Sequence, residues 1–341
     1  MKKLAILGMG HIGKYVYDTL SSDFNFAVSG YDLSLGHDLS DSKTLRDIIS
    51  TVDGVLCSTP FYLNVQIAEL CNQSGVDYFD LTESVTVTDY VKTLTNAKFV
   101  TQCGLAPGMV SIIANSLANK FDRVNSIQIR VGALPTHSNN SLKYYRTWNT
   151  EGLINEYINP CPALVNGVLV NLDPLDGLEK VEIHGVELEA ANTSGGIGSL
   201  PESWQLRAHN VNYKTLRYPG HWDNIKFLRD DLGLAENFDT YVKLFNDCIP
   251  TTTDDVVYIY INVTGQNVGQ STSSVRQYVQ KISCNENATA IQRSTAAGVM
   301  AVLETWATDH MNHLSGWVRQ EDLNGDVVLS SKYTTSIYGK I

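Results

Sequence analysis

The hexapeptide GMGHIG at residues 8–13 constrains the fold of this chain more than any other feature of the sequence. It directly follows a short apolar run at residues 3–7 and precedes a segment with helical spacing of apolar residues. Gly8 would permit a tight turn, Gly10 would let the backbone approach a pyrophosphate, and Gly13 would let helix and strand pack closely. The positive end of the helix would then face the phosphates. The motif predicts a dinucleotide-binding turn, with an ordinary glycine-rich turn as the alternative.

A carboxylate stands where such a motif needs its partner. Asp32 closes the next apolar run, FAVSGYD, 19 residues after Gly13. A carboxylate there accepts hydrogen bonds from the ribose hydroxyls and repels a 2′-phosphate. Residues 33–36 contain no Arg or Lys that would bind such a phosphate. We therefore expect NAD as the cofactor and NADP as the less favoured one.

The texture of the chain changes twice. Up to about residue 121, short apolar runs alternate with amphipathic stretches, a rhythm typical of βαβ units and a parallel sheet. Residues 124–284 contain strands of alternating pattern with a few helices, which indicates a mixed or antiparallel sheet. A long helix with a small-residue face follows at 287–313, and we expect it to pack back on the first sheet.

The predicted fold class is α/β: a doubly wound parallel sheet of the Rossmann type plus a second α/β domain with a mixed or antiparallel sheet. The predicted parts are a dinucleotide-binding domain at 1–122, a domain for substrate binding and dimerisation at 123–285, and a C-terminal helix and tail at 286–341 that return to the first domain.

Charge and cysteine content exclude several classes of protein. The net charge is −11 and Lys and Arg form no run, so a nucleic acid partner is not expected. The apolar stretch before the first glycine is too short for a signal peptide or a membrane span, so we expect a cytoplasmic protein with no membrane partner. The six cysteines lie far apart without a C-x-x-C pair, which predicts reduced thiols and no metal site.

Ligands of an open parallel sheet bind beyond the carboxyl ends of its strands, so the residues that follow each strand are candidates. Residues 57–60 are expected near the nicotinamide ribose, although they would also suit a plain strand-to-helix turn. Asp80 and Glu83 would be helix caps or solvated acids, or as a functional pair they would supply a carboxylate near the cofactor. The predicted cofactor-binding residues are Gly8, Gly10, His11, Ile12, Gly13, Asp32, Ser58, Thr59, Pro60, Cys103 and Gly104.

Five stretches together resemble the saccharopine dehydrogenase-like enzymes, and within them the lysine 6-dehydrogenase branch. These stretches are GMGHIG (8–13), GLAPGM (104–109), YYRTWNTEGLINEY (144–157), TSGGIGSLPESW (193–204) and TLRYPGHWDNIKFLRDDLGL (215–234). The resemblance implies an interrupted Rossmann domain, a sheet that pairs subunits, and hydride transfer between NAD(P) and a carbon that bears an amine. It implies oxidative deamination of L-lysine or a similar amine to a semialdehyde. A saccharopine or carboxyspermidine-type reductase that forms a secondary amine, and a non-catalytic NAD-binding regulator, are the alternatives.

These stretches also supply candidate substrate residues. Arg217 suits a substrate carboxylate, because a guanidinium binds one bidentately, but a structural ion pair is the alternative. Tyr144, Tyr145 and Trp148 would line an apolar slot for a methylene chain, or, as alternating aromatics on a strand, would belong to the core. Glu83 and His221 are the candidate catalytic residues, as acceptors of a proton from the substrate ammonium, although His221 would also serve as a helix cap.

We expect the partners to be a small amino acid or amine as substrate and a second copy of the chain. The apolar run VVYIYINVTG (256–265) looks like a strand whose edge a monomer would have to protect. It therefore predicts a homodimer or a higher homo-oligomer.

Overall fold

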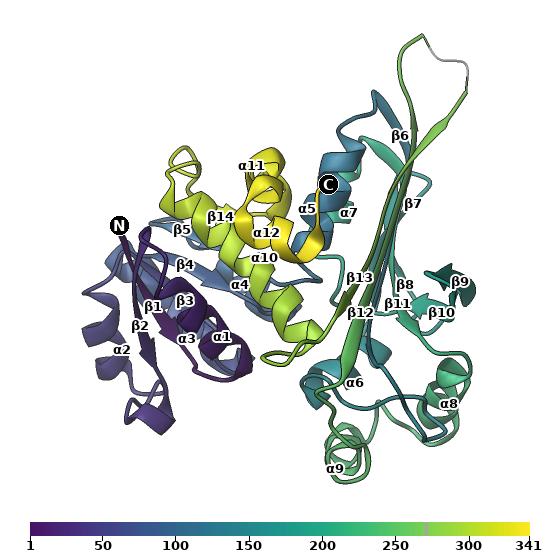
Figure 1. Cartoon of the computed structure of the whole chain (residues 1–341), viewed down its shortest axis with the longest axis horizontal. Helices are drawn as coiled ribbons and strands as arrows, with labels where there is room; N and C mark the ends of the chain where they lie inside the picture. The colour runs from purple at the N-terminus through teal and green to yellow at the C-terminus, as the bar shows by residue number, and fades with distance from the viewer. Residues whose placement is uncertain (270–271) are drawn as a thin grey trace. The chain divides into compact units, whose positions relative to one another are not determined.

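The computed structural model describes residues 1–269 and 272–341 and divides the chain into two compact units (Figure 1). The first comprises Met1–Ile112 and Ser294–Ile341, and the second comprises Ile113–Arg293. The chain thus passes into the second unit within helix α5 (Met109–Ala118) and leaves it within helix α10 (Ala290–Ala307).

The first unit is built on a parallel sheet with the strand order β14-β5-β4-β3-β1-β2. Its strands are β1 (Lys2–Leu7), β2 (Phe26–Tyr31), β3 (Gly54–Cys57), β4 (Asp77–Asp80), β5 (Lys98–Val100) and β14 (Gly316–Val318). All of β3 and the last four residues of β1 are buried, as befits strands covered on both faces. The predicted Rossmann-type sheet is confirmed, and its order reverses between β1 and β3, which makes their carboxyl ends the switch point.

Helices connect and cover these strands. They are α1 (His11–Leu20), α2 (Ser42–Ile49), α3 (Asn64–Ser74) and α4 (Val85–Val91), with short 3-10 turns η1 (Leu33–Leu35), η2 (Phe61–Leu63) and η4 (Gln320–Asp322). An apolar cluster that includes Leu45, Ile67, Val91 and Phe99 forms one core of this unit.

The C-terminal segment is held in the first unit by specific contacts. The ring of Trp306 in α10 packs edge-on against Phe79, and its Nε1 donates to Asp77 at 2.8 Å. The tail forms α11 (Gly325–Ser330) and α12 (Lys332–Tyr338), and the hydroxyl of Tyr338 donates to the carbonyl of Ser294 at 2.7 Å. Figure 1 shows these yellow elements beside β4 and β5.

The second unit is built on a mixed sheet with the order β13-β12-β6-β11-β10-β9, and β7 joins it through β11 and carries β8. Its strands are β6 (Arg123–Pro135), β7 (Cys161–Val165), β8 (Val168–Leu172), β9 (Glu179–Ile183), β10 (Val186–Asn192), β11 (Ala208–Arg217), β12 (Asp255–Gln266) and β13 (Ser274–Ser283). Only β6 and β11 are paired in parallel among the described strands of this sheet. The predicted mixed sheet is thereby confirmed.

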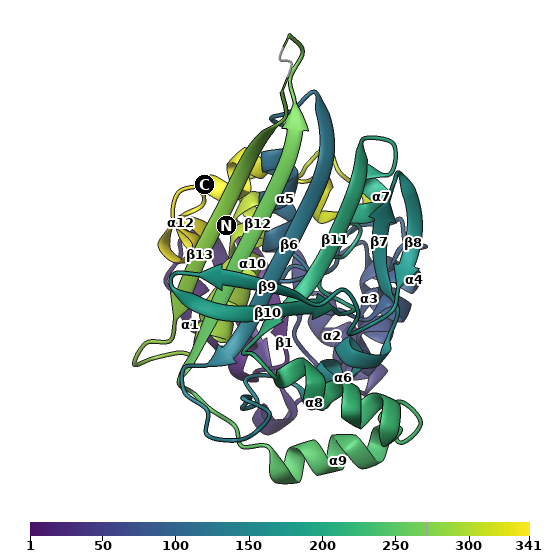
Figure 2. The same ribbon diagram turned by 90° about the vertical axis from the view of Figure 1, so that its right-hand side faces the viewer.

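The two faces of this sheet carry different layers. On one face lies a core of Tyr144, Tyr157, Trp222 and neighbouring apolar residues, supplied largely by helices. These helices are α6 (Thr150–Ile158), α8 (His221–Lys226) with the π-helical turn η3 (Phe227–Asp231), and α9 (Phe238–Cys248); α7 (Leu200–Trp204) precedes β11. On the other face the β9–β10 hairpin crosses the strands and buries a second core with Leu216 and Tyr258 (Figure 2).

The run KVEIHGVELEA at residues 180–190 is a hairpin, because His184 and Gly185 adopt left-handed φ values of 51° and 76° that suit a two-residue turn. Two local predictions are wrong. Residues 144–148 form a loop and not a strand. The run 256–265 is no free edge, since β12 pairs with β6 and with β13, and β13 is the edge strand.

None of the helices in the described ranges 1–269 and 272–341 is long and apolar enough to cross a membrane.

Candidate active site

The glycine turn joins strand, loop and helix at distances that only glycines allow. Gly8 has a φ of 93°, and a Cβ there would lie 2.6 Å from the carbonyl oxygen of Ser58. A Cβ on Gly13 would lie 2.0 Å from the carbonyl oxygen of Gly8. Both contacts are far inside van der Waals distance, so the turn after β1 is packed tightly against α1 and the end of β3.

The N-terminus of α1 borders empty space beside Gly10. Gly10 is its N-cap with φ −70°, and a Cβ there would meet no described atom within 4 Å. Within the part of the chain that the structure describes, no side chain caps this helix and its first turn holds no acidic residue. His11 is exposed and Ile12 is half-buried. Uncapped amides beside open space fit the pyrophosphate of a dinucleotide.

Asp32 is fixed to this turn by its carboxylate. Its Oδ2 accepts a hydrogen bond from the backbone N–H of Met9 at 2.9 Å, and its Oδ1 accepts from the N–H and the hydroxyl of Ser34 at 2.9 and 2.7 Å. These hydrogen bonds, the one from the Ser34 N–H first, hold the pKa of Asp32 below its usual range. The partly exposed group is therefore anionic at neutral pH and lies at the end of β2, beside the glycine turn.

In the turn after β3, Ser58 is hydrogen-bonded to the glycine turn, and the two residues that follow are at least partly accessible to solvent. The hydroxyl of Ser58 donates to the carbonyl oxygens of Gly8 at 2.6 Å and Leu7 at 3.2 Å, which ties β3 to the glycine turn. Thr59 is half-buried and Pro60 is exposed. The predicted residues at 58–60 thus lie together with Gly8 at the switch point.

The carboxyls after β4 have unequal surroundings. Asp80 is wholly buried, and its carboxylate accepts from the N–H groups of Thr82 and Gln102 at 3.1 and 2.9 Å and from the hydroxyl of Tyr78 at 3.0 Å. Burial raises the pKa of Asp80 to about 7. Ser84 is the N-cap of α4, so capping by Asp80 or Glu83 is ruled out. Glu83 is half-buried just before that cap.

The GLAPG loop lies beneath α10. A Cβ on Gly298 of α10 would come within 2.4 Å of the carbonyl oxygen of Gly104. The thiol of Cys103 donates inward to the carbonyl of Val100 at 3.2 Å, and burial raises its pKa. Ala106 is the half-exposed residue of this otherwise buried loop. Cys103 and Gly104 therefore shape the loop with their buried groups rather than present a side chain to a ligand.

In the second unit, Arg217 at the end of β11 is the centre of a buried cluster. Its side chain is 3% exposed, and Nη2 lies 3.5 Å from the carboxylate of Glu156 in α6. Its Nε and Nη2 donate to the hydroxyl of Tyr157 at 3.4 and 3.3 Å. The guanidinium also lies 5.0 Å from the ring centre of Tyr144. The nearby phenols and Glu156 outweigh the effect of burial and raise the pKa of Arg217, so its charge is permanent.

His221 is tied into this cluster through Tyr157. Its Nδ1 lies 2.8 Å from the carbonyl oxygen of Leu142, which can only accept, so Nδ1 carries the proton. Its Nε2 then accepts from the hydroxyl of Tyr157 at 3.1 Å. Burial, and secondly the charge of Arg217, lower the pKa of His221 to about 3. The imidazole is neutral and both ring nitrogens are occupied, which suits a residue that positions Tyr157.

Of the predicted aromatic residues, some pack into the cluster around Arg217 and one lies at its edge. Tyr144 packs against His221 with ring centres 5.6 Å apart, and its buried hydroxyl has no hydrogen-bond partner among the described residues. Trp148 is half-buried against the same core. Tyr145 is half-buried, and its hydroxyl donates to the Asn139 side chain. The structure therefore brings Arg217, Tyr144 and His221 together and leaves Tyr145 at the edge.

Sequence reasoning missed three members of the cluster: Glu156, Tyr157 and Trp222. Two lie at the end of the stretch YYRTWNTEGLINEY and one directly follows His221, so their neighbourhood was the available signal. Burial raises the pKa of Glu156 to about 7, with the neighbouring guanidinium acting against this rise. In residues 1–269 and 272–341, no His, Cys, Asp and Glu side chains form a group of three that would hold a metal ion.

A parallel sheet with a glycine turn at its switch point, followed by a mixed-sheet unit with a buried arginine, defines a two-unit α/β protein of the Rossmann class. Residues 104–331 match the family model described as the saccharopine dehydrogenase C-terminal domain. The chain belongs to the saccharopine dehydrogenase family of oxidoreductases, so the resemblance seen in the sequence is confirmed at the level of this family.

The chain is similar to curated proteins at low sequence identity. The mitochondrial alpha-aminoadipic semialdehyde synthase of Bos taurus is 24% identical over 305 residues, which cover 78% of this chain and 32% of that protein. The Arabidopsis thaliana enzyme of the same name is 29% identical over 152 residues, covering 40% of this chain and 14% of that protein. The chain spans about a third of the length of the bovine relative.

Solved structures show the same fold. An apo saccharopine dehydrogenase (L-Glu forming) from Saccharomyces cerevisiae matches with a TM-score of 0.79 at 14% identity and covers 99% of this chain and 98% of its own. A homospermidine synthase from Legionella pneumophila, solved in complex with NAD, matches with a TM-score of 0.65 at 13% identity over 99% of this chain and 90% of its own.

Proposed function

We propose that this chain is an NAD-dependent oxidoreductase that acts on a carbon–nitrogen bond of an amino acid, with L-lysine or a similar amine oxidised to a semialdehyde. The observation that carries the proposal is the glycine turn at the switch point, whose packing against Ser58 and whose link to Asp32 fit a dinucleotide. Membership of the saccharopine dehydrogenase family supports the reaction class.

The residues for the cofactor follow from that geometry. The amides from Gly10 to Gly13 would hold the pyrophosphate, and Asp32 would accept from the ribose hydroxyls. Thr59 and Pro60 would border the nicotinamide ribose. A bound nicotinamide supplies the acceptor for a hydride from the carbon that bears the nitrogen.

Arg217 is the proposed anchor for the substrate carboxylate. Its single carboxylate contact among the described residues is the 3.5 Å approach to Glu156, which is long for a charge-assisted hydrogen bond. The side chain is held by Tyr157 and Leu216, so it would meet a carboxylate in a fixed orientation. Tyr144 and Trp148 would pack along an aliphatic chain.

An ammonium must lose a proton before its carbon yields a hydride, so the reaction needs a proton acceptor. His221, with its pKa lowered to about 3, is a poor one, and we assign it to positioning Tyr157. Glu156, whose burial raises its pKa to about 7, is matched to proton transfer near neutral pH. Glu83, the other carboxylate proposed from the sequence, stays a candidate.

The test is a screen of cofactor reduction. The purified chain is mixed with NAD⁺ or NADP⁺ and with L-lysine, other amino acids and diamines, and the products are identified by mass spectrometry. We expect reduction of NAD⁺ with release of ammonia and formation of a semialdehyde. Binding of NAD without turnover of any amine, in either direction, would leave only the non-catalytic regulator.

A second candidate is a reductase that forms a secondary amine. It is favoured by the similarity to alpha-aminoadipic semialdehyde synthase, an enzyme named for a semialdehyde, because an aldehyde is one of the two substrates that such a reductase would join. The same assay run with NADH, an aldehyde and an amino acid distinguishes the reductase from the deaminating enzyme. The reductase consumes NADH only when both the aldehyde and the amino acid are present.

We also propose that the chain forms a homodimer through the exposed edge strand β13, since β12 is paired on both sides. Light scattering at micromolar concentration should give about twice the chain mass. A monomeric mass there would count against this assembly.

A further inference from the structure

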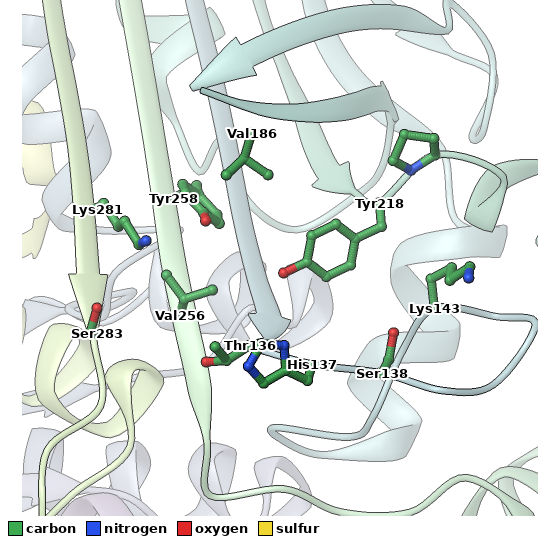
Figure 3. Close-up of a pocket in the computed structure, with 11 residues that line it drawn as sticks. Thr136, His137, Ser138, Lys143, Val186, Tyr218, Val256, Tyr258, Lys281 and Ser283 are labelled. Atoms are coloured by element: carbon green, nitrogen blue, oxygen red, sulfur yellow. The ribbon is translucent and has the colours of Figure 1, made fainter. Parts of the chain in front are cut away.

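A pocket of about 550 Å³ opens on the second unit, on the side of the sheet that the β9–β10 hairpin covers (Figure 3). Its inner wall is apolar and includes the buried residues Val256 and Tyr258 and the half-buried Val186. Figure 3 shows the ring of Tyr218 directed toward Val256 across this space. The volume falls within the range of small-molecule sites.

The rim of this pocket carries positive charge. Lys143 and Lys281 line it together with His137, and Ser138 and Ser283 add hydroxyl groups. In the described ranges, none of the two lysines and the histidine forms an ion pair.

Acids near the pocket weaken this field. Burial, and after it Tyr258 and Asp254, raise the pKa of Tyr218 to about 12. Glu189 accepts from the N–H of Gly220, which follows Pro219. Asp254 does not line the pocket. The lining thus presents two lysines and no carboxylate, which favours an anion.

The pocket is distinct from the cluster around Arg217. Leu216 packs in the core with Val256 and Tyr258, and successive side chains of a strand point to opposite faces. The Arg217 side chain therefore lies on the other face, against Tyr157. A ligand in the pocket would not occupy the proposed substrate anchor.

Two segments nevertheless border both places. Lys143 lines the pocket while its neighbour Leu142 accepts from His221 at 2.8 Å and its neighbour Tyr144 packs under Arg217. Pro219, which also lines the pocket, precedes His221 by two positions. A ligand that orders these segments would therefore also affect residues that contact Arg217 and His221.

We propose that this pocket binds a small organic anion, a carboxylate or a phosphate monoester with an aromatic or aliphatic body. Figure 3 shows Lys281 and Lys143 on opposite sides of Tyr218 and Val256. The charged group would lie at one of these two lysines, and the body would lie between them against Tyr218 and Val256. Apolar burial and charge then contribute together, so neither an inorganic anion nor a neutral aromatic has the full set of contacts.

Calorimetric titration of the full chain at low ionic strength tests the proposal. The probes are phenylacetate and phenyl phosphate, with inorganic phosphate, phenylacetamide and phenethylamine as comparisons. We expect a dissociation constant of about 1 mM or tighter for at least one organic anion, and binding at least about tenfold weaker for inorganic phosphate and for the neutral and cationic compounds. Whichever anion binds more tightly identifies the charged group that the site prefers.

The variant with both Lys143→Gln and Lys281→Gln should weaken the organic anion by about tenfold or more, because two charges are lost. Lys243→Gln, an exposed lysine in α9, is the matched control and should bind as the wild type does. The double variant should keep its thermal transition, since both lysines are exposed. Equal binding by the double variant, equal binding of phenylacetamide, or no binding of either organic anion would overturn the proposal.

Discussion

The two units build their candidate sites from different materials. In the first unit the site is formed mainly by backbone: the turn at Gly8–Gly13 offers amides and carbonyl oxygens, and three of its six residues are glycines. In the second unit the site is formed by side chains. Arg217 at the end of a strand and His221 in the helix that follows it meet Tyr157, which lies 60 residues before Arg217 in another helix. The first site depends on local conformation, whereas the second depends on packing.

This difference decides what a mutation does. One added methyl group on a glycine in a crowded turn disrupts the turn, because the methyl group clashes with backbone atoms that cannot move aside. A side-chain cluster fails more gradually, because Arg217 is held by four kinds of contact and each of them is only part of the total. The predictions below test this contrast.

The largest effect is expected for Gly13→Ala. The added Cβ would lie 2.0 Å from the carbonyl oxygen of Gly8 and 2.6 Å from the hydroxyl of Ser58, so the turn must shift. We expect a loss of about 2 kcal/mol or more in unfolding free energy, measured by urea denaturation, together with loss of NAD binding.

Gly10→Ala is the matched control. Its φ of −70° suits alanine, and its Cβ would meet no described atom within 4 Å, so the free energy of unfolding should stay within about 0.5 kcal/mol of the wild type. NAD affinity should nevertheless fall by about tenfold or more, because the methyl group would stand where the pyrophosphate approaches. Equal loss of stability in both variants would contradict the assignment of Gly13 to packing of the turn and of Gly10 to the approach of the pyrophosphate.

The next effect concerns Arg217→Lys, which keeps the charge but removes the planar fork. We expect kcat/KM for the amine substrate to fall by about 30- to 1000-fold, or roughly 2–4 kcal/mol, with NAD affinity unchanged. Arg207→Lys, at a partly stacked cation over Trp204, is the control and should leave kcat/KM unaltered. If Arg217→Lys folds and retains activity within a few-fold, Arg217 is a structural residue paired with Glu156.

The same contrast explains what the sequence could predict. The glycine turn, Asp32 and the alternation of strands and helices follow from a local pattern, and the structure has the predicted parallel sheet. By contrast, the pattern of residues 144–148 looked like a strand, but these residues form a loop, because Arg146 is held there by Ile249 and Asn246. That contact spans about a hundred residues of sequence, and no local pattern reports it.

Glu156 and Tyr157 show the same limit. Their side chains face Arg217 only because α6 packs on the sheet face opposite the β9–β10 hairpin. Helical spacing predicts which residues share a face of α6, but it does not predict which strand that face meets. The members of the Arg217 cluster were therefore only partly predictable.

A smaller effect is expected at Asp32. Replacing Asp32 with Ser and Ser34 with Arg removes the carboxylate and adds a cation for a 2′-phosphate. We expect the preference between NAD and NADP to shift toward NADP by roughly 1–3 kcal/mol, measured by titration with both cofactors. Tighter binding of NADP by the unaltered chain would contradict the proposed role of Asp32.

The pH dependence of stability sharpens the comparison inside the first unit, between two carboxyls whose pKa values shift in opposite directions. Burial raises the pKa of Asp80 to about 7, so the folded chain holds this proton more tightly than the unfolded chain does. The contribution of Asp80 to stability is therefore full below about pH 4 and is lost as the pH rises to about 7, with a slope of at most about 1.4 kcal/mol per pH unit. Asp80→Asn should remove this slope from the pH dependence of urea denaturation.

Asp32 has the opposite sign. Hydrogen bonds lower its pKa, so its contribution is present above the unfolded pKa and is lost as the pH falls below about 4. Asp32→Asn should therefore change the slope of unfolding free energy against pH only at acid pH. Asp80→Asn should change that slope between about pH 4 and 7. A profile that Asp80→Asn leaves unchanged in that window would mean that Asp80 ionises at its ordinary pKa. The N–H groups of Thr82 and Gln102 would then compensate fully for its burial.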